Sequence, residues 1–122
     1  MSHIVTIETE IRDAAAARAA CERLKLPLPA EGAHQLFSGT IRGLGVQLPG
    51  WRYPVVCNLE TGKVDFDNYG GHWGHQQELD QFLQAYAVER AKLEARRKGY
   101  SVSEQSLPNG SIRVSIQVGG AA

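Results

Sequence analysis

Residues 74–99 constrain the fold most, because they are predicted to form one long amphipathic helix. Large apolar side chains recur at helical spacing on one face of this segment: Leu79, Phe82, Leu83 and Tyr86. Gly99 is the expected left-handed cap at its end. At ~1.5 Å per residue the helix would be roughly 36 Å long, about the width of a globule of this size. The other elements must therefore pack along it.

The residues before this helix predict one strand, one short helix and further strands. Polar and apolar residues alternate over residues 3–11, which is typical of a strand. Asp13 is a suitable N-cap for an alanine-rich helix over residues 14–26, whose small side chains would cover a sheet without filling much volume. Residues 34–43 are expected to form another strand, and residues 51–68 a hairpin that turns at 60–62.

The residues after the long helix predict a second hairpin, with strands at 100–105 and 111–118. Its apolar residues are expected to face inward: Ile112, Val114, Ile116 and Val118. This order of elements indicates an α+β fold, a mostly antiparallel sheet with two helices on one face, one short and alanine-rich and one long. We expect residues 1–122 to be a single domain, because the chain is too short for two ordinary ones.

Composition argues against several classes of protein. Thirteen basic and thirteen acidic residues balance, with a pI near 6.9, so no overall field would attract nucleic acid or an anionic membrane. The sequence lacks a signal-peptide pattern and any run near the ~18 apolar residues of a membrane span. We therefore expect a soluble, cytoplasmic protein. Cys21 and Cys57 form no CxxC pair and are expected to be buried, reduced thiols.

Three blocks of sequence are spread along most of the chain. They are MSHIVTIETEIRD at the start, IRGLGVQ in the middle, and FLQAYAVERAKLEARRKGYSVSEQ followed by NGSIRVSI near the end. These blocks resemble the DUF1257 family, which is related to the Ycf35 products of algal chloroplasts and cyanobacteria. The segment VDFDNYGGHWG departs from the family pattern, since it is compressed and has Tyr69 and Trp73 where adjacent tryptophans are common. The resemblance implies a small soluble domain and supplies no catalytic residue, because the family has no established activity.

The segment NYGGHWGH, residues 68–75, leads into the long helix and is the candidate ligand-binding site. Its candidate residues are Gly70, Gly71, His72, Trp73 and His75. Free backbone N–H groups and the positive end of the helix dipole favour an anion such as phosphate at this place. The interpretation that we favour is structural. In it the glycines make the turn, Trp73 anchors the start of the helix in the core, and both histidines lie in solvent.

The same histidines, His72 and His75, also have a spacing that suits a metal ion. A third ligand would come from one of three residues: Asp67, Asp65 or His34. The glutamate of an HExxH motif is missing, so we predict neither a metal nor a cofactor.

A basic cluster near the end of the long helix is a candidate site for single-stranded nucleic acid. It contains Arg90, Lys92, Arg96, Arg97 and Lys98, with Tyr100 beyond it. Glu89 and Glu94 are interleaved with these cations and weaken their field, so a solvated helix end is the favoured interpretation. We expect nucleic-acid binding to be absent.

The sequence contains no motif that assembles a base, a nucleophile and a charge stabiliser. The glycines at 39, 43, 45 and 50 are expected to make turns or bulges, because no nucleotide-binding glycine motif is present. The favoured function is therefore a non-enzymatic binding or assembly module that acts through a protein partner or self-association. The alternatives are a small ligand-binding or metal-binding protein or enzyme that uses residues 67–75, and single-stranded nucleic-acid binding by the basic cluster.

Overall fold

The computed structural model describes residues 5–7 and 10–118, with side chains from residue 10 onward. In chain order the elements are β1 (Val5–Ile7), α1 (Ala14–Arg23), β2 (Ala30–Leu36), β3 (Gly39–Val46), β4 (Val55–Cys57), β5 (Val64–Phe66), the 3-10 turn η1 (Tyr69–Gly71), α2 (Gln76–Arg97), β6 (Ser101–Ser106) and β7 (Ile112–Gln117). The predicted α+β class is confirmed, with one short alanine-rich helix and one long helix.

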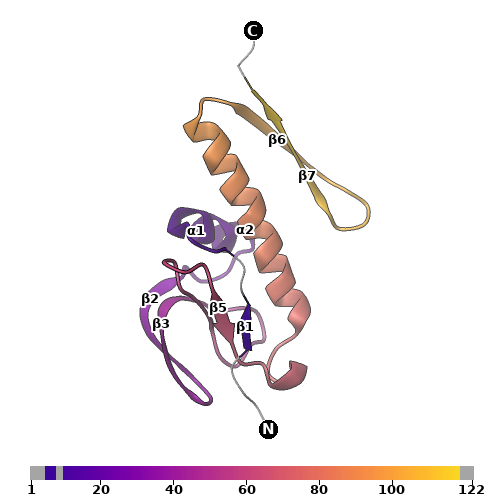
Figure 1. The fold of residues 1–122 in the computed structure, drawn as a ribbon. Coiled ribbons are helices and arrows are strands. Elements are labelled where there is room, and N and C mark those ends of the chain that lie inside the picture. The colour runs from indigo at the N-terminus through magenta and orange to yellow at the C-terminus, as the bar shows by residue number, and fades with distance from the viewer. Residues whose placement is uncertain (1–4, 8–9, 119–122) are drawn as a thin grey trace.

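Two antiparallel sheets flank the long helix (Figure 1). The larger sheet has the strand order β1-β5-β4-β3-β2, and β6 and β7 form a separate two-stranded sheet. Figure 1 shows α1 and the larger sheet on one side of α2 and the β6–β7 hairpin on the other. The second hairpin therefore does not extend the main sheet.

One apolar core lies between the larger sheet and the two helices. The predicted buried face of α2 is confirmed at Leu79, Phe82 and Tyr86, whereas Leu83 is only partly buried. The helix α1 contributes only small buried side chains: Ala16, Ala17, Ala20 and Cys21. Asp13 caps α1 as predicted, because its carboxylate accepts the N–H groups of the second and third helical residues at 2.9 and 3.2 Å.

Two predicted strands have different boundaries in the structure. Within residues 3–11, only 5–7 form a strand, residues 3–4 and 8–9 lie outside the described residues, and Ile11 is buried in the core outside any strand. Residues 34–43 are not one strand, because the chain turns after Leu36 and returns as β3. The glycines of β3 are strand residues and not turns. A Cβ at Gly45 would overlap the ring of His34, so this glycine permits a close approach.

The β6–β7 hairpin forms where predicted, but its apolar face is only partly covered. Ile112 and Val114 are half-buried, whereas Ile116 and Val118 are 43% and 71% exposed. The prediction that all four face inward is therefore wrong for the last two. The reason is that the small side chains of α2 opposite this end of the hairpin, Ala91 and Ala95, leave an open pocket beside Ile116 and Val118.

Charged side chains tie the other strand of this hairpin to both helices. Arg23 of α1 contacts Glu104 of β6 at 2.6 Å and Glu89 of α2 at 3.0 Å. Lys92 contacts the same Glu104 at 2.8 Å. Hydrogen bonds from Arg23 and then Lys92 lower the pKa of Glu104 to about 2. The network fixes β6 beside the two helices.

Candidate functional site

The predicted turn before α2 is a tight loop with left-handed backbone. Tyr69, Gly70 and Gly71 have φ angles of 48°, 61° and 100°. Glycine adopts such angles without a steric penalty, but tyrosine does not. The glycines therefore make the turn, as expected, and the loop also holds Tyr69 in a strained conformation that fixes the direction of its ring.

Asn68, which the sequence did not single out, organises this loop. Its side chain is buried and its amide donates a hydrogen bond to the Gly74 carbonyl at 3.1 Å. Its own carbonyl accepts the N–H groups of Gly71 and Trp73 at 3.0 and 2.9 Å. The N–H of His72 is donated to the Tyr69 carbonyl at 3.1 Å. Most N–H groups of the loop are thus used internally, and the anion site at Gly70 and Gly71 stays a prediction.

Trp73 is half-buried and lies outside the apolar core, so the prediction that it anchors the helix in the core is wrong. That role belongs to Trp51, which is 5% exposed and packs edge-on against Phe66 with ring centroids 5.6 Å apart. The indole Nε1–H of Trp51 donates to the His75 carbonyl at 3.1 Å. Gly74 lies directly against the Trp51 ring, where a Cβ would overlap it. Sequence periodicity gives no signal for this contact, because Trp51 and Gly74 are far apart in the chain.

Trp73 instead forms the centre of an aromatic cluster built from distant segments. The ring centroids of Phe37, Tyr53 and Tyr69 lie 5.2, 5.6 and 4.8 Å from that of Trp73. Arg52 lies over the Trp73 ring, with its guanidinium carbon Cζ 5.0 Å from the centroid, which is a cation–π distance. We call these five residues, Phe37, Arg52, Tyr53, Tyr69 and Trp73, the aromatic surface.

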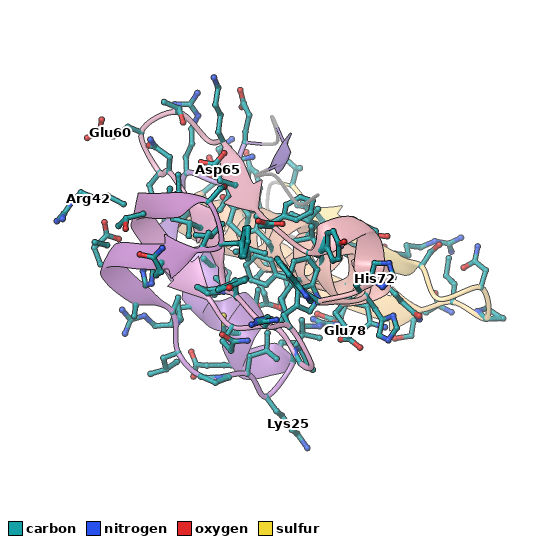
Figure 2. The ribbon with its side chains drawn as sticks, turned by 90° about the horizontal axis from the view of Figure 1, so that it is seen from below. Lys25, Arg42, Glu60, Asp65, His72 and Glu78 are labelled. Atoms are coloured by element: carbon teal, nitrogen blue, oxygen red, sulfur yellow. The ribbon has the colours of Figure 1, made fainter. Side chains whose placement is uncertain are left out.

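The aromatic surface is open to solvent. Phe37 is 56% exposed and Tyr69 is 38% exposed. In the part of the chain that the structure describes, the Arg52 guanidinium forms no ion pair and its contacts are with the Trp73 and Tyr53 rings. The ring of His72 lies 5.0 Å from that of Tyr69 and extends the surface. Figure 2 shows His72 beside the loop that leads into α2, with Arg42 and Glu60 at the far side of the molecule.

The histidines His72 and His75 are both exposed, as expected. Among residues 10–118, no group of three histidine, cysteine or acidic side chains is placed to hold a metal ion. Of the suggested third ligands, His34 lies against the Ala30 carbonyl, with Nε2 at 2.8 Å. Asp67 is buried, with Oδ1 accepting the Tyr69 N–H at 3.3 Å and Oδ2 without a hydrogen-bond partner among the described residues.

The other candidate groups give little support for catalysis or nucleic-acid binding. Cys21 and Cys57 are buried free thiols, as predicted, and burial raises their pKa values to about 11 and about 12. Such thiols carry almost no nucleophilic thiolate near neutral pH. Within the basic cluster, Lys92 is held by two glutamates and Arg97 lies 3.5 Å from Asp13. Part of the positive charge predicted there is therefore neutralised.

No protein-family model, curated protein or solved structure matches the chain, so the resemblance to the DUF1257 family stays a prediction. Neither helix in the described ranges has the length and apolar content of a membrane-spanning segment.

Proposed function

We propose that this protein is a non-enzymatic binding module that holds an extended segment of a partner protein on its aromatic surface. The observation that carries the proposal is the gathering of four rings and one arginine from three segments, with Trp73 at the centre. Tryptophan, tyrosine and arginine supply most of the binding energy in protein interfaces. Membership of the DUF1257 family is part of the proposal and adds no catalytic residue.

The tilts of the rings indicate which side chains the partner presents. The planes of Phe37, Tyr53 and Tyr69 make angles of 48°, 72° and 37° with the Trp73 ring. Rings tilted against one another present both faces and edges, and a flat, rigid group such as proline can pack against them. Proline-rich segments favour aromatic surfaces of this kind, because they are already extended and lose little entropy on binding.

The charge of the surface indicates a second feature of the partner. Arg52 is positioned by two rings, and its guanidinium donors face no carboxylate in the described residues. A partner carboxylate would complete this arrangement with a charge-assisted hydrogen bond. The expected partner segment therefore contains proline close to an aspartate or glutamate.

The same geometry disfavours the alternative functions. A single-stranded nucleic acid also stacks on aromatic rings, but its phosphates need a track of cations, and this surface offers Arg52 alone on a chain of zero net charge. An enzyme would need an acid, base or nucleophile beside the rings. Of the groups considered, His72 and Asp67 lie there, but the His72 ring contacts Tyr69 and the Asp67 carboxylate is buried against the Tyr69 N–H.

A peptide selection tests the proposal. Random dodecapeptides displayed on phage are selected on the full chain, and enriched peptides are measured by fluorescence anisotropy with wild type and variants. We expect enriched peptides to contain proline and an acidic residue. Trp73→Ala should weaken them at least ~30-fold, as for an interface hot spot. Arg52→Gln should weaken the acidic peptides selectively, and Leu28→Ala, at a 58% exposed site elsewhere, should have no effect.

Three results would contradict the proposal. The first is that no peptide is enriched, and the second is that enriched peptides bind Trp73→Ala as well as wild type. The third is that a deoxythymidine oligonucleotide binds the wild-type surface more tightly than any peptide and loses affinity in Trp73→Ala.

A further inference from the structure

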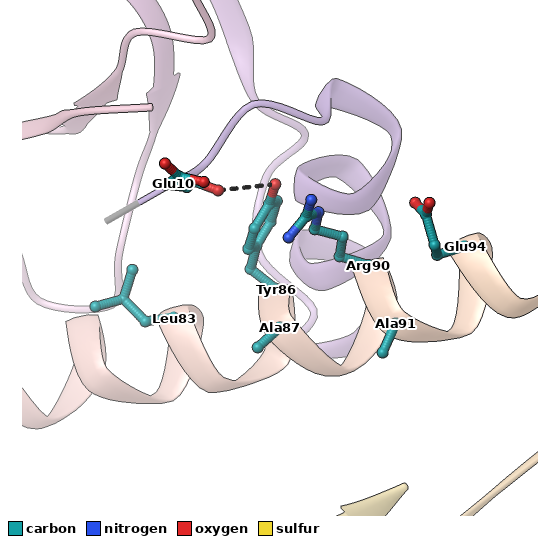
Figure 3. Close-up of a pocket in the computed structure, with 7 residues that line it drawn as sticks. All are labelled: Glu10, Leu83, Tyr86, Ala87, Arg90, Ala91 and Glu94. Atoms are coloured by element: carbon teal, nitrogen blue, oxygen red, sulfur yellow. Dashed lines mark hydrogen bonds between the residues drawn. The ribbon is translucent and has the colours of Figure 1, made fainter. Parts of the chain in front are cut away.

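One face of α2 is left open and forms a groove. Two pockets of about 460 and 400 Å³ lie along it and share Ala91 and Glu94. The first is lined by Glu10, Leu83, Tyr86, Ala87, Ala91 and two charged residues of α2, as Figure 3 shows. The Tyr86 hydroxyl accepts the N–H groups of Arg12 and Asp13 at 3.1 Å, so the segment around Glu10 is a fixed wall of this pocket.

The strand β7 borders the other end of the groove. The second pocket is lined by Ala91, Ala95 and Tyr100 together with Ile116 and Val118 of the hairpin. In the part of the chain that the structure describes, β7 pairs with β6 and with no other strand, so its outer edge is free. Free apolar edges of this kind are normally covered or paired, because they otherwise join other chains.

The exposed large apolar residues are concentrated in two places. Among the described residues they are Leu28, Phe37, Tyr69, Ile116 and Val118. Phe37 and Tyr69 belong to the aromatic surface, and Ile116 and Val118 belong to the edge of β7. The edge is therefore a second interaction surface, separate from the first.

The sequence of β7 is complementary to itself when two copies run antiparallel about Ser115. This register places Ile112 opposite Val118 and Val114 opposite Ile116, so all apolar side chains share one face. On the other face, Arg113 lies opposite Gln117, and no like charges meet. Pairing about Arg113 would instead place two arginines opposite each other.

We propose that two copies of this chain form a symmetric dimer by pairing the outer edges of β7 about Ser115. The two hairpins then make one four-stranded antiparallel sheet, and its apolar face covers the groove along α2 of each copy. Small residues at the floor of the groove, Ala87, Ala91 and Ala95, allow this close approach. Because both copies use the same edge, related by a two-fold axis, the assembly stops at two copies.

The edge of β6 does not offer the same surface. Its residues include one large apolar side chain, Val102, and Glu104 is already held by Arg23 and Lys92. Pairing at β6 would leave Ile116 and Val118 exposed and the groove open. The proposal therefore concerns β7 alone, and it does not rest on the proposed peptide binding.

Cysteine cross-linking in the full chain tests the register. Residues directly opposite in antiparallel strands have Cβ atoms about 4.5–5.5 Å apart, which is close to disulfide geometry. Copper phenanthroline with oxygen accepts the two electrons and two protons that a pair of thiols releases. We expect Ser115→Cys to give a covalent dimer on a non-reducing gel. The native thiols are buried and should not compete.

Two matched variants control this experiment. Ser103→Cys lies directly opposite Ser115 within the hairpin, but on β6, and should not cross-link. Arg113→Cys lies on β7, but would be about 13 Å from its copy in this register, since the two are four residues apart along the strand. It should therefore cross-link at most one-tenth as fast as Ser115→Cys.

Sedimentation equilibrium tests the dimer without a covalent bond. We expect a wild-type dimer, and Ile116→Lys with Val118→Lys should raise its dissociation constant at least ~30-fold by charging the edge. Leu28→Lys, at an exposed apolar site elsewhere, should leave it unchanged. A wild-type protein that sediments as a monomer at ~100 µM would overturn the proposal, since that limits any affinity to a very weak one. Cross-linking of Ser103→Cys as fast as Ser115→Cys would also overturn it.

Discussion

The two tryptophans of this chain lie on either side of the loop that leads into α2, and they have opposite surroundings. Trp51 is buried against Phe66 and donates its indole N–H to the His75 carbonyl. Trp73 is half-buried among three other rings and Arg52, outside the apolar core. The same residue type thus stabilises the fold at one position and forms an accessible surface at the other.

The difference between them comes from their neighbours. Gly74 has no side chain, and this absence lets the Trp51 ring pack against the backbone at the start of α2. Trp73 precedes that glycine by one residue, and the strained turn at Tyr69 brings an exposed ring against it.

Trp51→Ala should cause the largest loss of stability. It removes a large buried ring and one of the two donors to the His75 carbonyl, the other being the Glu78 N–H, so we expect the free energy of unfolding to fall by ~3–5 kcal/mol. Urea denaturation followed by circular dichroism measures this loss. A loss below about 1 kcal/mol would show that Trp51 is not a core residue.

Gly74→Ala should have the next largest effect. The new Cβ would overlap the Trp51 ring, and the displacement of packed groups should cost ~1–3 kcal/mol in the same denaturation measurement. Gly39→Ala is the matched control, because a Cβ there meets no atom within 4 Å. Equal stability of the two variants would contradict the proposed contact between Gly74 and Trp51.

Trp73→Ala should cost only about 1 kcal/mol of stability, because much of this ring remains in contact with water in the folded protein. The denaturation midpoint should stay near that of wild type while peptide binding is lost. A loss of stability as large as that of Trp51→Ala would mean that both tryptophans stabilise the core, which would contradict the proposed difference between them.

Glu104→Gln should have the smallest effect and a distinct pH dependence. Its carboxylate joins β6 to the helices at a partly solvated site, so its removal should cost at most about 1 kcal/mol. Because the folded pKa of about 2 lies below the unfolded value of about 4.3, this stabilisation is present above about pH 4.3 and is lost as the pH falls toward 2.

Thermal unfolding at pH 7 and pH 3 measures the effect of Glu104. Wild type and Glu104→Gln should differ most at pH 7 and clearly less at pH 3, where the folded carboxylate is still largely ionised but the unfolded one is already protonated. Glu60→Gln, whose carboxylate forms no ion pair among the described residues, should not change this pH dependence. If the melting temperatures of wild type and Glu104→Gln changed with pH by the same amount, the hairpin would be held by apolar packing alone, as Trp51 is.

Local sequence patterns were sufficient to predict the two helices. The period of apolar residues located α2, and the side chain of Asp13 located the start of α1. The β2–β3 hairpin was predicted as a single strand over 34–43, because the glycines of β3 were interpreted as turns, whereas Gly45 serves a close contact with His34 on the neighbouring strand. In the sequence, a glycine that makes a turn cannot be distinguished from a glycine that lets a distant side chain pack against the backbone.

The aromatic surface that we propose as a binding site overlaps the predicted loop only in part. The loop at residues 68–75 does carry the exposed His72 and the half-buried Trp73. Phe37 and Arg52, which complete the aromatic surface, come from segments whose sequences show no sign of that proximity. Likewise, only the tertiary structure shows that Trp51 is buried and Trp73 half-buried, since each follows a glycine-containing segment.

Acrylamide quenching of single-tryptophan variants tests most directly the claim that Trp73 is an accessible binding residue. Trp51→Phe leaves Trp73 as the only indole, and Trp73→Phe leaves Trp51. We expect strong quenching of Trp73 that falls when a selected acidic, proline-containing peptide is added, and weak quenching of Trp51 that the peptide does not change. Equal quenching of the two indoles, or a peptide that binds without protecting Trp73, would contradict the account.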